Sequence, residues 1–310
     1  MHFPGRFADQ LLADQLHQIS LSFLVDDLVI RRGGVAANIA YGMGRLGQHP
    51  VLLGAVGSDF ADYRSWLERN GVNCDHVHVS DEKHTARFVC TTDEDMNQIA
   101  SFYAGAMSEA RSIELQPVVE QTGADFVVIS ADDPAAMLRH TQECRQRGYA
   151  FAADPSQQLA WLSGEQAREL VTGAQVLFTN AYEKELLETK SGLSEAQIGE
   201  LVEVRVTTLG SKGVEIVGGD FAPVHVPIAK EYMKADPTGV GDGFRAGLLA
   251  ARGWSLGWER AAQVGSMVAA MVLENVGTQE YDLDGAEFLR RLAESYGAEA
   301  ADEVGAFLPA

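Results

Sequence analysis

The chain has 310 residues, of which 46% are hydrophobic and 22% charged, the composition of an ordinary soluble globular protein with a sizeable core. Its formal net charge of -20 argues against nucleic acids and anionic membranes as partners, because both are bound through clustered Lys and Arg. An anionic small molecule would have to be held locally, by backbone amides at a helix N-terminus, by a divalent cation or by a few placed side-chain cations.

The three cysteines, Cys74, Cys90 and Cys144, favour a reducing compartment. They show no C-x-x-C spacing, and an odd number fits poorly with a framework of disulfides. No apolar run approaches the roughly 20 residues of a membrane span, and the N-terminal residues lack the apolar core of a signal peptide. We therefore expect a cytoplasmic protein.

The first hundred residues predict a compact β-α unit at 33–72, between two segments, 21–32 and 86–103, that have the pattern of strands. These strands would need long detours to join a central sheet, so a small separate sheet is the simpler arrangement. Ligand sites of open α/β sheets lie at the carboxyl edge of the strands. We expect a β-sheet lid over that edge, formed by about 10–32 and 84–104.

From about residue 120, short β-rich apolar runs alternate with helical patterns, as in parallel strands joined by helical crossovers. The predicted strands are 126–130, 150–153, 176–179 and 204–209. The predicted crossover helices are 135–148, 164–173 and 181–188. This pattern predicts an α/β fold with three layers, α/β/α, around a mostly parallel central sheet.

The last third of the chain predicts further helices, each with one apolar face. They span 241–253, 256–275 and 285–296. Gly253 and Gly277 are the expected helix ends, because glycine readily adopts the left-handed conformation that closes a helix. We expect one domain over 1–310, with its core in 33–75 and 106–310.

A Gly-rich turn runs directly into one of these helices, in the sequence Asp236-Pro237-Thr238-Gly239-Val240-Gly241-Asp242. Its glycines allow successive amides to point at one anion, and the helix dipole adds positive potential there. A carboxylate at the helix start suits a base that accepts a hydroxyl proton during phosphoryl transfer. Gly and Asp are also common at turns and helix starts for structural reasons alone, so the turn by itself leaves both interpretations open.

Four motifs in order resemble those of the ribokinase-like (PfkB) kinases. The first signature of that family resembles Gly33-Gly34-Val35-Ala36-Ala37-Asn38-Ile39-Ala40, and the second resembles 236–247. Between them, Asn180-Ala181-Tyr182-Glu183 resembles the N-x-x-E motif and Thr208-Leu209-Gly210-Ser211-Lys212-Gly213 the nucleotide-binding T-x-G-x-x-G stretch. The resemblance implies a ribokinase-like fold with a small β-sheet lid.

Further stretches are similar to one branch of that family, the adenosine kinases of mycobacteria and related actinobacteria. They are 3–7, 20–28, 100–103, 154–158 and 277–280. The resemblance implies an ATP-dependent phosphotransferase of purine salvage, in which ATP and adenosine give ADP and AMP.

The resemblance also implies roles for individual residues. Asp242 would deprotonate the ribose 5′-hydroxyl while the amides of Gly239, Val240 and Gly241 stabilise the transferring phosphoryl group. Gly34 and Asn38 would lie against the ribose hydroxyls. The ATP pocket would be lined by Asn180, Thr208, Gly210, Gly213 and Ser266.

Metal ions are implied in the same way. Asn180 and Glu183 would organise Mg²⁺ through water. Asp236 and Thr238 match positions that bind a monovalent cation in several members of the family, so K⁺ is a further candidate beside the anion-binding turn.

Two aromatic residues of the predicted lid, Phe88 and Phe102, are candidates for stacking on a purine, a contact worth roughly 1 to 3 kcal/mol. Packing within the lid is the alternative for both. Gln158 is a candidate for reading the edge of adenine. Because exposed lid strands often pair between subunits, we also expect a homodimer through the lid.

The chain departs from the family in one respect. Members of the family usually open with a strand that ends in an aspartate, and no such strand precedes Phe3. Either about fifteen residues before it are missing from the numbering, or the protein lacks that strand and its substrate ligand. The alternatives to an adenosine kinase are a sugar kinase of the ribokinase or fructokinase type and a nucleoside-binding homologue without catalysis.

Overall fold

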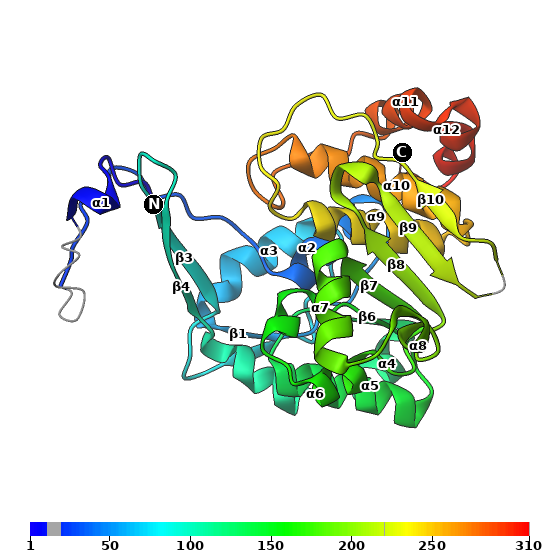
Figure 1. Ribbon diagram of the computed structural model, residues 1–310, viewed down its shortest axis with the longest axis horizontal. Helices are drawn as coiled ribbons and strands as arrows, with labels where there is room; N and C mark the ends of the chain where they lie inside the picture. Colours follow the sequence, from blue (N-terminus) through cyan, green and yellow to red (C-terminus); the bar gives the residue numbers. More distant parts are fainter. Residues whose placement is uncertain (11–19, 220, 310) are drawn as a thin grey trace.

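The central sheet confirms the predicted parallel strands and extends beyond them. The computed structural model describes residues 1–10, 20–219 and 221–309, and among these six strands form the sheet in the order β10-β9-β8-β7-β6-β5 (Figure 1). Their bounds are β5 (Phe126–Ile129), β6 (Ala150–Ala153), β7 (Val176–Asn180), β8 (Val204–Thr208), β9 (Val214–Gly218) and β10 (Val224–Val226). Strands β5 to β8 are parallel, whereas β9 and β10 run antiparallel at one edge and were not predicted.

Helices cover both faces of the sheet, so the predicted three layers are confirmed (Figure 1). Along β7, Val176 and Phe178 pack into one core and Leu177 into the other, as alternate residues of a strand must. One face is covered by α5 (Pro134–Arg147), α6 (Gly164–Val171), α7 (Ala181–Ser191) and α8 (Glu195–Gly199). The other is covered by α2 (Val35–Arg45), α9 (Val240–Gly253) and α10 (Trp258–Leu273).

Four more of the described helices lie around these layers: α3 (Ala61–Arg69), α4 (Leu115–Thr122), α11 (Gly285–Tyr296) and α12 (Ala298–Gly305). Helix α1 (Phe7–Gln10) lies beside the N-terminus, away from the layers (Figure 1). The expected end at Gly253 is confirmed, since α9 stops there, but the one at Gly277 is wrong. Helix α10 ends at Leu273, and the Gly277 amide instead donates to Asp236 Oδ2 (3.1 Å).

The lid is a hairpin of β3 (Arg87–Thr92) and β4 (Gln98–Tyr103) that stands away from the layered body (Figure 1). Phe88 pairs with Phe102 across the hairpin, so both side chains project from the same face. The turn between the strands is organised by Asp93, whose buried carboxylate accepts the amides of Phe7, Asp95 and Asn97. Strands β1 (Ala55–Gly57) and β2 (His78–Ser80) pair in parallel near the base of the hairpin.

The predicted strand over residues 21–32 is wrong. This segment has no regular structure, and its pairing is limited to one isolated bridge between Asp27 and His2. Leu24 and Ile30 are 86% and 84% exposed, so these apolar residues do not belong to a strand packed in the lid. The expected lid portion at 11–19 lies outside the described residues. No helix in the described ranges has the length and apolarity needed to cross a membrane.

Helices α9 and α10 pack at unusually close range because glycines face each other. A Cβ placed on Gly247 would lie 2.8 Å from both Gly265 Cα and Val264 O. A Cβ on Gly243 would lie 2.7 Å from Val272 Cγ2. The glycine at 243 therefore allows the close approach of α10, which offsets its low helix propensity.

Gly247→Ala should lower the free energy of unfolding by about 1–3 kcal/mol, because its methyl group would push α9 away from α10. Urea unfolding with an unchanged m-value would measure the loss. The control is Gly199→Ala in α8, where an added Cβ meets nothing within 4 Å. Equal effects of the two substitutions would contradict the packing argument.

Candidate functional site

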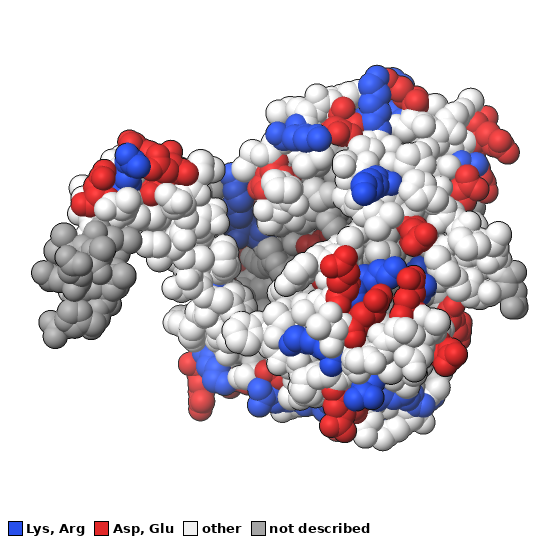
Figure 2. Space-filling model, viewed as in Figure 1, with Lys and Arg blue, Asp and Glu red and all other residues white. Residues whose placement is uncertain are grey.

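Several of the predicted site residues meet at the carboxyl edge of the parallel strands. Asp154 follows β6, Asn180 ends β7, Thr208 ends β8, and the N-terminus of α9 lies at the same edge. In open α/β sheets this edge holds the ligand site, since loops and helix N-termini converge there. Figure 2 shows a deep hollow between the lid and the layered body.

The Gly-rich turn has the conformation that the sequence predicts. Gly239 is the N-cap of α9 at φ 80°, and a Cβ on it would lie 2.8 Å from Thr278 Cγ2, so glycine is required twice over. Asp236 closes the turn by accepting the amides of Thr238 (2.9 Å) and Gly277 (3.1 Å). Burial alone would raise the pKa of Asp236, but these hydrogen bonds outweigh it and lower the pKa below its ordinary value.

Asp242 lies in the first turn of α9, where its carboxylate accepts a hydrogen bond from Asn38 Nδ2 (2.8 Å). Burial raises the pKa of Asp242 above its ordinary value, while the Asn38 hydrogen bond and the charge of Arg245 oppose the rise. A desolvated carboxylate with one oxygen fixed is a suitable acceptor for a hydroxyl proton. This geometry supports the role predicted for Asp242.

The orientation of the Asn38 side chain is fixed by its other contacts. Asn38 Oδ1 accepts from Gln279 Nε2 (2.9 Å) and from Thr278 Oγ1 (2.9 Å). Gln279 is held in turn, because its Oε1 accepts from Trp66 Nε1 (3.1 Å). With Oδ1 facing two donors, Asn38 must present Nδ2 to Asp242. The sequence predicts that Asn38 lies at the ribose, but it does not predict this contact with Asp242. The two residues belong to separate motifs 204 residues apart, so no local pattern indicates that they meet.

The N-x-x-E motif forms a reciprocal cap at the start of α7. Asn180 Oδ1 accepts the Glu183 amide (2.8 Å), and Glu183 Oε2 accepts the Asn180 amide (2.8 Å). This arrangement leaves Glu183 Oε1 without a recorded hydrogen bond among the described residues. A carboxylate oxygen suits water-mediated Mg²⁺, so Glu183 fits the predicted role better than Asn180, whose Oδ1 already accepts the Glu183 amide.

The nucleotide-side residues occupy the end of β8 and the turn after it. Thr208 ends the strand, Gly210 begins the 3-10 helix at φ 60°, and Gly213 follows at φ 89°. A Cβ on Gly213 would lie 2.1 Å from Val226 O, so the close approach of β10 requires glycine. Ser266 is buried on α10, away from this turn in sequence.

The substrate-side residues are more widely spread. Gly34 is the N-cap of α2 at φ 101°, a conformation that favours glycine. Gln158 lies after β6, and its Nε2 donates to Asp132 O (2.7 Å). Phe88 and Phe102 are 68% and 59% exposed, so packing within the lid does not account for them. The structure brings Asn38 to Asp242 but leaves both phenylalanines on the outstretched hairpin.

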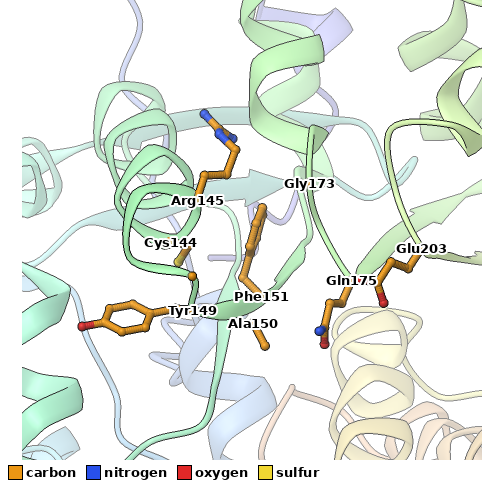
Figure 3. Close-up of a pocket in the computed structure, with 9 residues that line it drawn as sticks. Cys144, Arg145, Tyr149, Ala150, Phe151, Gly173, Gln175 and Glu203 are labelled. Carbon is orange, nitrogen blue, oxygen red and sulfur yellow. The ribbon is translucent and has the colours of Figure 1, made fainter.

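A separate cavity of about 310 Å³ lies at the opposite, amino-terminal edge of the sheet (Figure 3). It is lined by Tyr149 before β6, Gln175 before β7 and Glu203 before β8, together with the end of α5. Arg145 at its rim already donates to the carbonyls of Glu169 (2.9 Å) and Thr172 (3.1 Å). This cavity is distinct from the predicted site.

Residues 9–284 match the pfkB family carbohydrate kinase. The chain belongs to the PfkB family. It is 34% identical over 257 residues to the nucleoside kinase of Methanocaldococcus jannaschii, which covers 80% of both chains, and 34% identical to that of Methanothermobacter thermautotrophicus over 86% of both. The chain is thus an ATP-dependent phosphotransferase that acts on a sugar or nucleoside hydroxyl.

Solved structures agree with the observed fold. The nucleoside kinase of Burkholderia thailandensis in complex with inosine superposes with a TM-score of 0.82 at 32% identity, covering 96% of this chain and 94% of that one. Ribokinase from Thermotoga maritima superposes with a TM-score of 0.71 at 19% identity, covering 92% and 91%, which shows the fold alone. The predicted ribokinase-like fold is confirmed.

Gln279→Met should lower kcat for phosphoryl transfer by about 10- to 100-fold, because Asn38 would lose one of the two donors that fix its amide and Asp242 would lose its orientation. A steady-state assay of ADP release would measure the change. Gln121→Met on the exposed end of α4 is the control and should leave kcat unchanged. Equal kcat for both variants would contradict the positioning role of Gln279.

Proposed function

We propose that this chain is an adenosine kinase, which transfers the γ-phosphoryl group of ATP to the 5′-hydroxyl of adenosine. The observation that carries the proposal is the half-buried Asp242 carboxylate, held by Asn38 beside the glycine turn at the N-terminus of α9. Asp242 takes the hydroxyl proton as the oxygen attacks the γ-phosphorus. The amides of Gly239, Val240 and Gly241 receive the charge on the transferring group.

Gln158 supports adenosine over other nucleosides. Asp132 O can only accept, so the Gln158 amide nitrogen must face it and Oε1 is left for a ligand. An acceptor at that place suits the exocyclic amine of adenine, whereas inosine carries an oxygen there. The Burkholderia relative is described in complex with inosine, so a preference for adenosine would distinguish the two proteins.

The lid supports a nucleoside rather than a plain sugar. Phe88 and Phe102 are paired across the hairpin and largely exposed, so one face of the lid offers two rings to a planar ligand. Their use as a clamp requires the hairpin to move toward the body when the substrate binds. A ribose or fructose has no flat face for such stacking.

Metal ions complete the proposed chemistry. When bound, Mg²⁺ would neutralise negative charge on the phosphates of ATP. Glu183, with Asn180 fixing its position, would hold the Mg²⁺ through water. The ionised Asp236 and the neighbouring Thr238 would hold K⁺ against the back of the turn. Thr208, Gly210, Gly213 and Ser266 would line the pocket for the adenine of ATP, and Gly34 would let the ribose of the acceptor approach α2.

The exposed apolar surface of the lid supports a homodimer, in which a second copy would pair with the lid edge. The three free cysteines, Cys74, Cys90 and Cys144, fit a cytoplasmic enzyme of purine salvage. Light scattering at micromolar concentration that gives the mass of one chain would contradict the homodimer.

Asp242→Asn should lower kcat by several orders of magnitude while changing adenosine affinity much less, since Asn can still accept from Asn38 but cannot take a proton. The measurement is ADP release at saturating Mg-ATP and adenosine, with affinity from calorimetry. Turnover close to that of the unmodified protein would refute the assignment of the base.

A panel of adenosine, inosine, guanosine, ribose and fructose should give the highest kcat/KM with adenosine. Turnover of the sugars alone would make the chain a sugar kinase. Adenosine binding in calorimetry without turnover in Mg-ATP would make it a nucleoside-binding homologue.

Phe102→Ala should lower kcat/KM for adenosine by about 10-fold or more, the loss expected for one stacking contact, while leaving the slower reaction with ribose unchanged. Ile99→Ala, on the opposite face of the same strand, is the matched control. A decrease of the same size with ribose would show that the ring acts on the lid and not on the base.

A further inference from the structure

Arg245 is a buried cation that the chemistry above does not use. It lies on α9 one turn after Asp242, and its side chain is 8% exposed. Its Nη2 donates to Asp154 Oδ1 (2.6 Å), and Asp154 is fully buried behind β6. The guanidinium carbon lies 5.6 Å from the centre of the Phe178 ring. A charge removed from water to this degree is costly unless its surroundings compensate it.

The pairing of Arg245 with Asp154 is incomplete. Elsewhere in the chain, the buried Arg291 donates through Nη1 and Nη2 to both oxygens of Glu274 (2.8 and 2.7 Å), the two-point geometry that favours a structural ion pair. In the described part of the chain, Asp154 Oδ2 is instead buried without a partner, whereas Nε lacks a partner in Arg245 and in Arg291 alike. An ion pair that served only to join β6 to α9 would be expected to use both oxygens.

The guanidinium lies directly against the turn that receives phosphate. A Cβ on Gly241 would lie 2.8 Å from Arg245 Nη1, so the missing side chain at 241 makes room for the cation. Three carboxylates surround it: Asp154, Asp242 and Glu183. Burial lowers the pKa of Arg245, but the charges of these carboxylates outweigh it, so the guanidinium stays protonated.

Among the described groups that act on the Asp242 carboxylate, Arg245 is the one with a positive charge. The groups that face or act electrostatically on that carboxylate come from separate elements: Asn38 in α2, Asp154 after β6, Glu183 in α7, Arg245 in α9 and Tyr281 in the segment before α11. Two of them are carboxylates and two are neutral polar side chains. A further anion arriving at the turn would meet net negative charge if Arg245 were removed.

We propose that Arg245 is a positioning residue of the phosphoryl-transfer site and is anchored by Asp154. Its guanidinium supports the 239–241 turn and balances the charges of the Asp242 and Glu183 carboxylates. The inference rests on the proposed kinase function. It assigns the cation a role that the helix dipole alone cannot fill, because the amides point at the anion while three carboxylates lie behind them. Asp154 fixes the direction of the guanidinium through one hydrogen bond to Nη2, while Nη1 faces the turn at Gly241.

The test compares Arg245→Gln, Arg245→Lys and Asp154→Asn in the full chain. Arg245→Gln should lower kcat about 100-fold, the loss typical of one preorganised group, while KM for adenosine changes less than about threefold. Arg245→Lys keeps the charge and should recover at least about tenfold of that loss. Asp154→Asn keeps an acceptor for Nη2 and should lower kcat less than Arg245→Gln does.

Arg205→Gln is the matched control, since Arg205 on β8 is 14% exposed and also bonds a single carboxylate, Glu195 (2.9 Å). It should leave kcat unchanged. Unchanged kcat in Arg245→Gln, or no recovery in Arg245→Lys, would overturn the inference. Should Arg245→Gln fail to fold, kcat of Arg245→Lys and of Asp154→Asn is compared with that of the unmodified protein. Unchanged kcat in both variants would then overturn the inference. A chain without phosphotransfer to any nucleoside or sugar would instead refute the proposed function.

Discussion

Keeping the half-buried Asp242 carboxylate ionised is the constraint around which this site is arranged. Desolvation disfavours its charged form unless nearby groups compensate. Three such groups surround it: the N-terminal amides of α9, the Asn38 amide on α2 and the Arg245 guanidinium. Each is fixed by a different part of the fold, so the proposed base would work only if the sheet, α2 and α9 hold their relative positions.

Helix packing supplies that precision. Gly42 lies one turn beyond Asn38 on α2, and Ala246 lies one turn beyond Asp242 on α9. A Cβ on Gly42 would lie 2.6 Å from Ala246 Cβ, so the two helices meet at van der Waals contact one turn from the hydrogen bond between Asn38 and Asp242. Contact at one turn sets the register at the next, because both helices rise by the same amount per residue. The small residues in these helices thus set how closely α2 and α9 approach, and with it the spacing between Asn38 and Asp242.

Local patterns in the sequence predicted most of the elements and the turn, but few of the contacts between them. Strand 150–153 and helix 285–296 were predicted at their observed bounds, because apolar periodicity and flanking glycines are local signals. Residues 21–32 were predicted wrongly, since their apolar side chains have the composition of a strand but no partner. The hydrogen bond from Gln279 to Asn38 joins positions 241 residues apart, and no local sequence pattern around either residue indicates the contact.

The acidity of the whole protein and its proposed use of ATP are reconciled by the kind of donor at the turn. Backbone amides carry no net charge, so a chain of formal charge -20 can present them to phosphate without a cluster of exposed cations. Two cations near the turn are instead engaged: Arg31 donates to Val276 O (2.9 Å), and Arg245 is buried against Asp154. Because these charges are fixed by the protein, they would support an anion without having to be reorganised when it arrives. Selectivity for phosphate would then come from geometry within the hollow, while the acidic exterior repels nucleic acid.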